Sequence, residues 1–269
     1  DSTKSELRVL GVLNADGTAS SRIVLESNAG SPARGDWGGV HLLSSTANSF
    51  FDYVTVRHAT SGVSSLAGSG TAFQRSVVEH CQQYGLNITA GALQLSESIV
   101  RSNGSYGVYV SQASPAITSS LIHDNGGRGV YVYQSGSTGR TVTLRNNTIV
   151  GNGGYGIYAS ESYAGNLTVH ATNNIVVRNG SYGLYNASGY ATFGLSNNLV
   201  WGHSSADYYS VSSGDSPIGE NPLFVDEAGR NLRITSNSPA RLHASDGADI
   251  GALAYDGTPT PFLAGHLYA

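Results

Sequence analysis

One sequence pattern recurs along most of this chain at a nearly constant spacing. The clearest copy is residues 147–159, N-T-I-V-G-N-G-G-Y-G-I-Y-A, and close copies occupy residues 98–110, 120–132 and 174–186. Weaker copies begin at Asp52, Ser76 and Asn198. A repeat at this spacing is typical of a solenoid, in which each copy packs only against its neighbours.

Each copy contains two short runs of alternating apolar residues, many of them β-branched. Such runs predict β-strands whose apolar side chains share one interior. The shared positions are Val54, Val78, Val100, Ile122, Ile149, Val176 and Val200 in the first run, and Val108, Val130, Ile157 and Leu184 in the second.

A corner of constant length separates the two runs in each copy. It carries Asn-Gly at Asn103, Asn125, Asn152 and Asn179, while the single cysteine, Cys81, takes the Asn position one copy earlier. Because Asn and Gly tolerate a left-handed backbone, we expect that conformation at this corner. We expect the same of the glycine that precedes each second run, namely Gly85, Gly107, Gly129, Gly156 and Gly183.

Strands joined by short corners at a fixed period pair in parallel with their equivalents one turn away, about 4.8 Å along the axis. Residues 37–202 resemble the right-handed parallel β-helix repeats of pectate-lyase-like proteins. The resemblance implies three strands per turn, an interior of stacked aliphatic side chains and a ladder of asparagines at the short corner. We therefore predict an all-β, single-stranded right-handed parallel β-helix, a solenoid of about 22–27 residues per turn.

We expect one domain with four parts. Residues 1–36 form the opening coils, 37–203 the regular turns, 204–256 a closing segment that folds over the last turn, and 257–269 a linker-like tail. The chain starts at Asp1 without Met, which is typical of a mature or excised piece. The first coil is either blunted by residues 1–6 or left as an open edge, and an open parallel edge allows homotypic end-to-end association.

Composition argues against several classes of partner. The net charge is −4 and Lys4 is the single lysine, so no basic patch is available for nucleic acid. No apolar run is long enough for membrane insertion. One cysteine excludes a disulfide within the chain, and no Cys/His spacing predicts zinc. A chain rich in Ser, Thr, Asn, Gly and Tyr and poor in lysine is typical of exported bacterial proteins, so we expect an extracellular or bacterial cell-surface location.

Tyrosines recur at two positions of the repeat, and these are our candidate substrate-binding residues. They alternate with the inward aliphatic residues or lie at the adjoining corner, so we expect them to face solvent in rows about 4.8 Å apart. Exposed aromatic rings can stack on sugar faces, which favours polysaccharide as the partner. The alternative is that the rings stack on one another and stiffen the sheet. The strand row is Tyr109, Tyr131, Tyr158 and Tyr185; the corner row is Tyr84, Tyr106, Tyr155 and Tyr182, interrupted by Arg128.

Charged residues form a second candidate site. Glu79, Arg101 and His123 occupy one position in successive copies, and His80 and Asp124 share the next column with Arg178. Cleavage or epimerisation of an acidic polysaccharide needs a cation on the carboxylate and a base for the adjacent proton. Arg101 would serve as the cation and His123 as the base, with Glu79 or Asp124 orienting the histidine or holding a metal. The alternative is a structural ladder of ion pairs.

The sequence also departs from the known enzymes of this fold. It lacks the acidic cluster of calcium-dependent pectate lyases, the paired aspartates of polygalacturonase-like hydrolases and the Asp-Pro-His-Asp motif of mannuronan epimerases. We therefore predict no cofactor or metal, since calcium has no clear acidic cluster to hold it. Three hypotheses stay open: a polysaccharide-binding or structural surface module, a polysaccharide lyase or epimerase, and a unit that assembles end to end.

Overall fold

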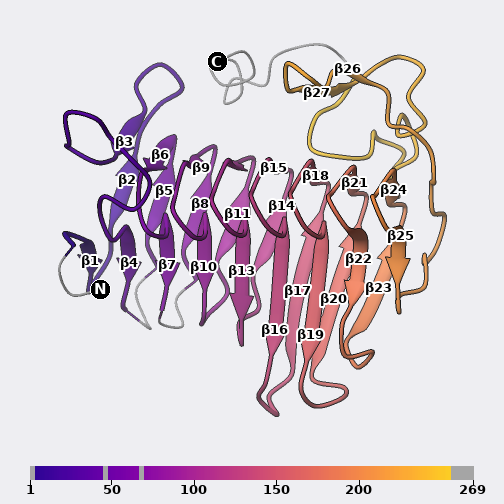
Figure 1. Cartoon of the computed structure of the whole chain (residues 1–269), viewed down its shortest axis with the longest axis horizontal. Helices are drawn as coiled ribbons and strands as arrows, with labels where there is room; N and C mark the ends of the chain where they lie inside the picture. Colours follow the sequence, from indigo (N-terminus) through magenta and orange to yellow (C-terminus); the bar gives the residue numbers. More distant parts are fainter. Residues whose placement is uncertain (1–3, 45–47, 67–69, 256–269) are drawn as a thin grey trace.

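The computed structural model describes residues 4–44, 48–66 and 70–255, which form a parallel β-solenoid (Figure 1). These residues contain no helix, and three parallel sheets run the length of the coil. Each strand pairs in register with its equivalents in the turns before and after. The prediction of an all-β parallel β-helix is confirmed. The predicted tail, 257–269, lies outside the described residues.

The three sheets contain 25 of the strands. We number the sheets 1, 2 and 3 in the order in which their first strands, β1, β2 and β3, occur along the chain. Sheet 1 has nine strands: β1 (Leu7–Val9), β4 (Val40–Leu42), β7 (Val63–Ser65), β10 (Leu86–Ile88), β13 (Val108–Ser111), β16 (Val130–Gln134), β19 (Ile157–Glu161), β22 (Tyr182–Asn186) and β25 (Ala206–Tyr209). Sheet 2 has eight: β2 (Asn14–Asp16), β5 (Phe50–Asp52), β8 (Ala72–Gln74), β11 (Gln94–Ser96), β14 (Ala116–Thr118), β17 (Arg140–Arg145), β20 (Leu167–Thr172) and β23 (Thr192–Ser196). Sheet 3 has eight: β3 (Ile23–Leu25), β6 (Val54–Arg57), β9 (Val77–Glu79), β12 (Ile99–Arg101), β15 (Leu121–His123), β18 (Thr148–Val150), β21 (Ile175–Val177) and β24 (Leu199–Trp201).

The interior is a stack of aliphatic columns, as the repeat predicts. Val100, Ile122, Ile149, Val176 and Val200 are register partners in sheet 3, and each is at most 1% exposed. The prediction that Val54 belongs to this column is wrong. Val56, not Val54, pairs with Val78, so the turn between them is shorter than the weak copy at Asp52 implied.

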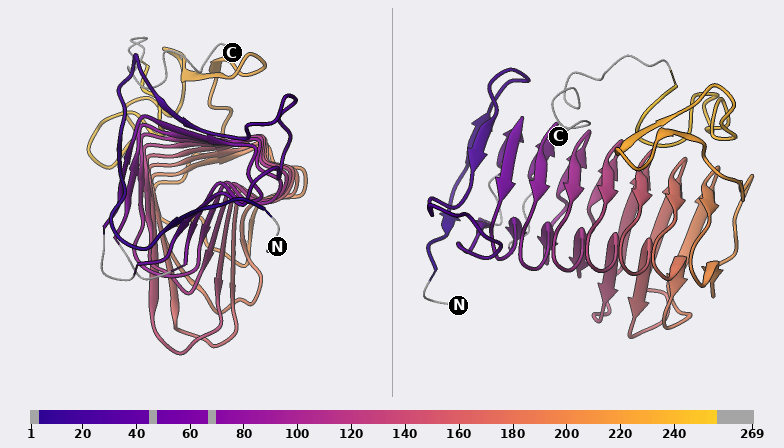
Figure 2. Two further views of the ribbon diagram at one scale, coloured as in Figure 1. Left: turned by 90° about the vertical axis from the view of Figure 1, so that its left-hand side faces the viewer. Right: turned by 45° about the horizontal axis from the view of Figure 1, so that its top comes forward.

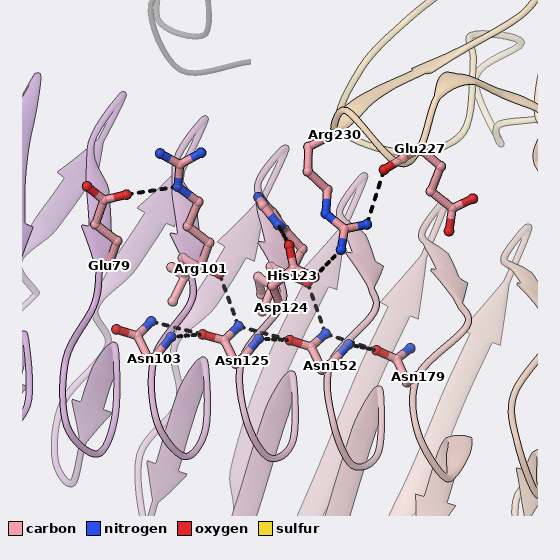
Figure 3. Close-up of polar contacts among 12 residues, drawn as sticks. Glu79, Arg101, Asn103, His123, Asp124, Asn125, Asn152, Asn179, Glu227 and Arg230 are labelled. Carbon is pink, nitrogen blue, oxygen red and sulfur yellow. Dashed lines mark hydrogen bonds and ion pairs between the residues drawn. The ribbon is translucent and has the colours of Figure 1, made fainter. Parts of the chain in front are cut away.

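The corner between sheets 3 and 1 is held by the expected asparagine ladder (Figure 3). The side-chain amide of Asn103 donates to Asn125 Oδ1 at 2.9 Å, Asn125 donates to Asn152 at 2.9 Å, and Asn152 donates to Asn179 at 2.9 Å. The buried Cys81 stands one turn before Asn103, and its backbone N–H donates to Asn103 Oδ1 at 3.0 Å. Burial raises the pKa of the Cys81 thiol to about 12.

The left-handed residues of this corner are not the ones that we expected. The residue before each ladder position takes the left-handed conformation, with φ of 52° at His80, 53° at Ser102 and 55° at Asp124. The repeated glycines serve close packing instead. A Cβ on Gly107 would lie 2.7 Å from the carbonyl oxygen of Gly129 and 2.7 Å from the Ile122 side chain.

A second ladder, which we did not predict, closes the corner between sheets 2 and 3. At six successive steps along the coil, a backbone N–H donates to the side-chain oxygen of the equivalent residue in the next turn, at 2.9–3.1 Å. The accepting residues are Ser76, Ser98, Ser120, Asn147, Asn174 and Asn198. Each of these six residues begins a copy of the repeat. The first copy begins at Asp52, which does not take part. The polar first position of each copy was therefore the sequence signal for this ladder.

The closing segment covers more than the last turn. Asp215 and Ile218 bridge to the final strands of sheets 2 and 3. The chain then turns back along the outer face of sheet 3, where β26 (Phe224–Asp226) and β27 (Asn231–Ile234) pair as an antiparallel hairpin (Figures 1 and 2). A second apolar cluster forms there from outward side chains of sheet 3 and from the segment, including Leu232, Ile234, Ala240, Ile250 and Leu253.

The ladder should dominate stability at its corner, and Asn152→Ala tests this. The change removes the side-chain acceptor of the Asn125 backbone N–H and the side-chain donor to the Ile122 carbonyl, both of which are buried. Each buried group that loses its partner costs about 1–3 kcal/mol, so we expect the free energy of unfolding to fall by about 2–6 kcal/mol. Urea denaturation measures this, with the exposed Asn237→Ala as control. Equal stability of the two variants would contradict a stabilising ladder.

His203 ends the same ladder and should make stability depend on pH. Its Nδ1 accepts from the Asn179 backbone N–H at 3.1 Å and its Nε2 donates to the Val176 carbonyl at 3.1 Å, a pattern that needs the neutral ring. Burial lowers the pKa of His203 below its usual 6.5. The unfolded chain therefore takes up the proton first, and stability is lost as pH falls below 6.5 towards the folded pKa.

In His203→Asn, the amide oxygen can accept the same hydrogen bond at any pH. We expect urea denaturation at about pH 7.5 and about pH 5 to show a smaller loss of stability in this variant than in the wild type. An unchanged loss would assign the pH dependence to other groups.

Candidate functional site

Strand pairing in sheet 1 gathers the predicted tyrosines on one outer face. Tyr109, Tyr131, Tyr158, Tyr185 and Tyr209 are successive register partners. The corner row lies beside them, in ring contact at 4.8–6.3 Å. We call this surface the tyrosine face: Tyr84, Tyr106, Tyr109, Tyr131, Tyr155, Tyr158, Tyr182, Tyr185 and Tyr209, with Arg128.

Much of the tyrosine face is a stack of rings along the solenoid axis. Tyr185 stacks on Tyr158 at 5.3 Å and on Tyr209 at 4.4 Å, with interplanar angles of 8° and 9°. Tyr155 and Tyr182 stack at 5.9 Å in the corner row. Rings stacked in this way turn their faces to each other, so their edges and hydroxyl groups are what they offer to solvent. Tyr209 ends the strand row and is 45% exposed.

Arg128 interrupts the stack at its middle. Its guanidinium carbon lies 4.0 Å from the ring centre of Tyr158 and 4.4 Å from that of Tyr131, and Nη1 donates to the Tyr106 hydroxyl at 2.7 Å. Tyr131 stands nearly perpendicular to Tyr106 and to Tyr158, at 89° and 88°. Among the described residues no carboxylate pairs with Arg128, so the aromatic rings are its main partners.

Three tyrosines of the face have a raised pKa, which keeps their hydroxyl groups protonated at neutral pH. Burial, together with neighbouring tyrosines, raises the pKa of Tyr84 and of Tyr185. Burial also raises the pKa of Tyr131, although Arg128 opposes the shift. The face therefore presents hydroxyl groups that can both donate and accept hydrogen bonds.

The predicted charged column lies in register on sheet 3. Arg101 is the Cα partner of both Glu79 and His123. Its Nε donates to Glu79 Oε2 at 2.8 Å (Figure 3). Arg57 lies 4.0 Å from the other oxygen of Glu79. Glu79 is only 5% exposed. The cation proposed to meet a substrate carboxylate is therefore already paired with a buried carboxylate of the chain.

His123 and Asp124 form a hydrogen-bonded pair that the closing segment helps to cover. The Nδ1–H of His123 donates to Asp124 Oδ2 at 2.8 Å, and the guanidinium of Arg230 donates to Asp124 Oδ1 (Figure 3). Burial lowers the pKa of His123. Burial acts to raise the pKa of Asp124, but the opposing effect of His123 and Arg230 is larger, so the pKa of Asp124 is lowered. Asp124 thus orients the ring as we proposed, yet His123 is only 3% exposed, so a polymer has little access to it.

Arg178 occupies the same corner position as His80 and Asp124, each being the left-handed residue before a ladder position. Its side chain, however, pairs with Glu227 and Asn221 of the closing segment and lies over the Trp201 ring. His58, which we did not select, stacks against His80 with ring centres 6.3 Å apart. The two histidines occupy equivalent places in successive turns, and the misplaced start of the first copy hid this relation.

The described part of the chain shows no arrangement of three or more His, Cys, Asp or Glu residues that could hold a metal ion. In the same residues, no helix has the length and apolar character needed to span a membrane. The two candidate sites must therefore be judged by their hydrogen-bonding groups, charges and accessible surface.

Comparison with known proteins places the fold. The family model described as "Right handed beta helix region" matches residues 18–116 and 38–200. The chain belongs to the right-handed β-helix family. No curated protein sequence matches it. A solved structure titled "Crystal structure of pectate lyase Pel9A" has a TM-score of 0.62 and 15% sequence identity, over 94% of this chain and 86% of that one. At this identity, the likeness shows that the two β-helices share a fold.

The link between Arg230 and Asp124 should hold the closing segment on this β-helix. In Arg230→Gln the ion pair is lost, so we expect faster hydrogen–deuterium exchange in residues 223–235 with unchanged exchange at the asparagine ladder. Arg145→Gln is the matched control because Arg145 makes a looser pair with Asp246, at 3.5 Å, with both side chains about half exposed. Equal exchange in the two variants would show that the apolar cluster alone retains the segment.

Proposed function

We propose that this protein binds polysaccharide along the tyrosine face. The observation that carries the proposal is the row of tyrosines on five consecutive strands of sheet 1, with a parallel row at the adjoining corner. A regular row of identical groups complements a polymer of identical units. The likeness of the fold to a pectate lyase is consistent with a role related to carbohydrate.

The arrangement favours hydrogen bonding over ring-on-sugar stacking. Mutual stacking fixes the ring orientations before any ligand arrives, so little side-chain entropy is lost on binding. The hydroxyl groups and the Arg128 guanidinium then supply donors and acceptors at the spacing of the turns, while ring edges supply apolar contact. A surface of this kind suits the hydroxyl groups of an extended glycan, and we place the protein outside the cell or on a bacterial surface, where such polymers occur.

The two other hypotheses stay as predictions with less support. A lyase or epimerase using His123 and Arg101 requires access to a histidine that is 3% exposed and to an arginine already paired with Glu79. End-to-end assembly would use the edge strands of the three sheets, which are β1, β2 and β3 at one end of the coil. At the other end, Asp215 and Ile218 already bridge to sheets 2 and 3.

The double variant Tyr131→Ala plus Tyr158→Ala tests the binding proposal. It removes two adjacent rings at the centre of the face, which are also the two rings nearest Arg128. We therefore expect at least tenfold weaker retention on the polysaccharides that the wild type binds in a broad screen. The matched control is Tyr163→Ala plus Tyr190→Ala, which removes two loop tyrosines that are 62% and 52% exposed. Binding equal to the wild type in the first variant, or no binding of any glycan by the wild type, would refute the proposal.

A second variant, Tyr131→Phe plus Tyr158→Phe, separates the hydroxyl groups from the rings. It preserves ring packing and hence the fold, and circular dichroism confirms that the sheet is intact. If the hydroxyl groups carry the affinity, this variant should also bind more weakly. Full binding by the phenylalanine variant would instead assign the affinity to the aromatic rings.

A further inference from the structure

A pocket of about 310 Å³ lies beside the first turns of the coil, at the corner between sheets 3 and 1. Its lining is Pro32, Ala33, Arg34, His58 and His80. The two histidines follow β6 and β9 at successive turns, and both have a left-handed backbone, with φ of 62° and 52°. The volume is at the small end of ligand sites, sufficient for one sugar or a small anion.

The two histidine rings line this pocket together. Their rings are stacked at 6.3 Å with an interplanar angle of 20°. His58 Nδ1 is buried and makes no hydrogen bond with any described residue. The nearest carboxylate, Glu26, lies 3.8 Å from that nitrogen and is bound instead to Arg57 at 2.6 Å. A buried ring nitrogen without a hydrogen bond is costly, so His58 keeps hydrogen-bonding capacity that no described residue uses.

The loop that supplies Arg34 is fixed before any ligand binds. Asp36 Oδ2 accepts from the Ser27 hydroxyl at 2.6 Å and from the Ala33 N–H at 2.9 Å. The N–H groups of Gly35 and Asp36 both donate to the His58 carbonyl at 3.0 Å. These contacts hold the backbone on both sides of Arg34 beside His58, so the loop itself need not be ordered when a ligand binds.

Arg34 has unused donors. Its Nη1 makes a long hydrogen bond of 3.4 Å to the Cys81 carbonyl, and no carboxylate pairs with it in the described part of the chain. The acidic side chains around the site have other partners: Glu26 binds Arg57, Glu79 binds Arg101, and Asp36 holds its own loop. An exposed guanidinium with free N–H groups beside two imidazoles is suited to an oxyanion.

We propose that Arg34, His58 and His80 form a binding site for a single oxyanion, either a phosphate or sulfate group or the carboxylate of an acidic sugar. Arg34 supplies the positive charge and a planar set of donors, and the imidazole N–H groups complete the cradle. Burial, together with Arg34, Arg101 and His58, lowers the pKa of His80 although Glu79 opposes the shift, so this ring acts chiefly as a neutral donor. The site is independent of the tyrosine face, which lies on the outer surface of sheet 1.

Isothermal titration with inorganic phosphate, sulfate and galacturonate tests the site, with galactose as the neutral match for galacturonate. We expect one molecule of at least one oxyanion to bind per chain, with galactose silent. Arg34→Gln should weaken that binding at least tenfold, and His80→Phe, which keeps a stacked ring on His58, should weaken it several-fold. Arg8→Gln is the control, because the Arg8 side chain is 62% exposed and pairs with Glu6 instead of lining the pocket.

The outcomes separate this site from the proposed function. The tyrosine double variant should keep its oxyanion affinity, and Arg34→Gln should keep its polysaccharide affinity if the polymer is neutral. Tighter binding of galacturonate than of phosphate or sulfate would identify an acidic sugar as the ligand, and the reverse order would identify a phosphate or sulfate group. Absence of binding by all three anions, or equal binding by wild type and Arg34→Gln, would overturn the proposal.

Discussion

Hydrogen bonds to the polar side chains of the next turn hold the two tight corners of this β-helix. A sharp corner leaves backbone N–H groups without a strand partner, and burying them unpaired costs about 1–3 kcal/mol each. Asn125 meets this cost by accepting from Asn103 with Oδ1 and donating with Nδ2 to Asn152 and to the Val100 carbonyl. Because both ladders need equal corner geometry in every turn, the extra residues of the longer turns appear elsewhere, in β16, β17 and the connection between them.

This constraint explains which features could be predicted from sequence. Columns such as Val100 to Val200 repeat in every turn, so one alignment of the copies gives them all. The left-handed positions of the asparagine corner were assigned wrongly because propensity favours Asn and Gly, whereas the structure places His80, Ser102 and Asp124 in that conformation, each just before the ladder position. Tertiary hydrogen bonding here outweighs a local preference of about 1–2 kcal/mol.

The closing segment could not be placed by periodicity, since its contacts do not repeat. Arg178 reaches Glu227 and Arg230 reaches Asp124, over 49 and 106 residues. One signal was present: Ile175, Val176 and Val177 form a continuous apolar run, which is typical of a parallel strand covered on both faces. Reading that run would have predicted a cover for sheet 3, and with it the burial of His123.

The same distinction between repeated and unrepeated contacts separates the two proposed sites. The tyrosine face arises from the repeat, so each turn adds another hydroxyl group, and the affinity for a polymer can grow with the number of turns engaged. The pocket of Arg34, His58 and His80 depends on a loop that occurs once, which limits it to one charged group. A glycan that carries an anion only at one end would suit both surfaces, whereas a neutral polymer would engage the tyrosine face alone. The two proposed ligands would thus be selected by different parts of the sequence, the repeat and the single loop.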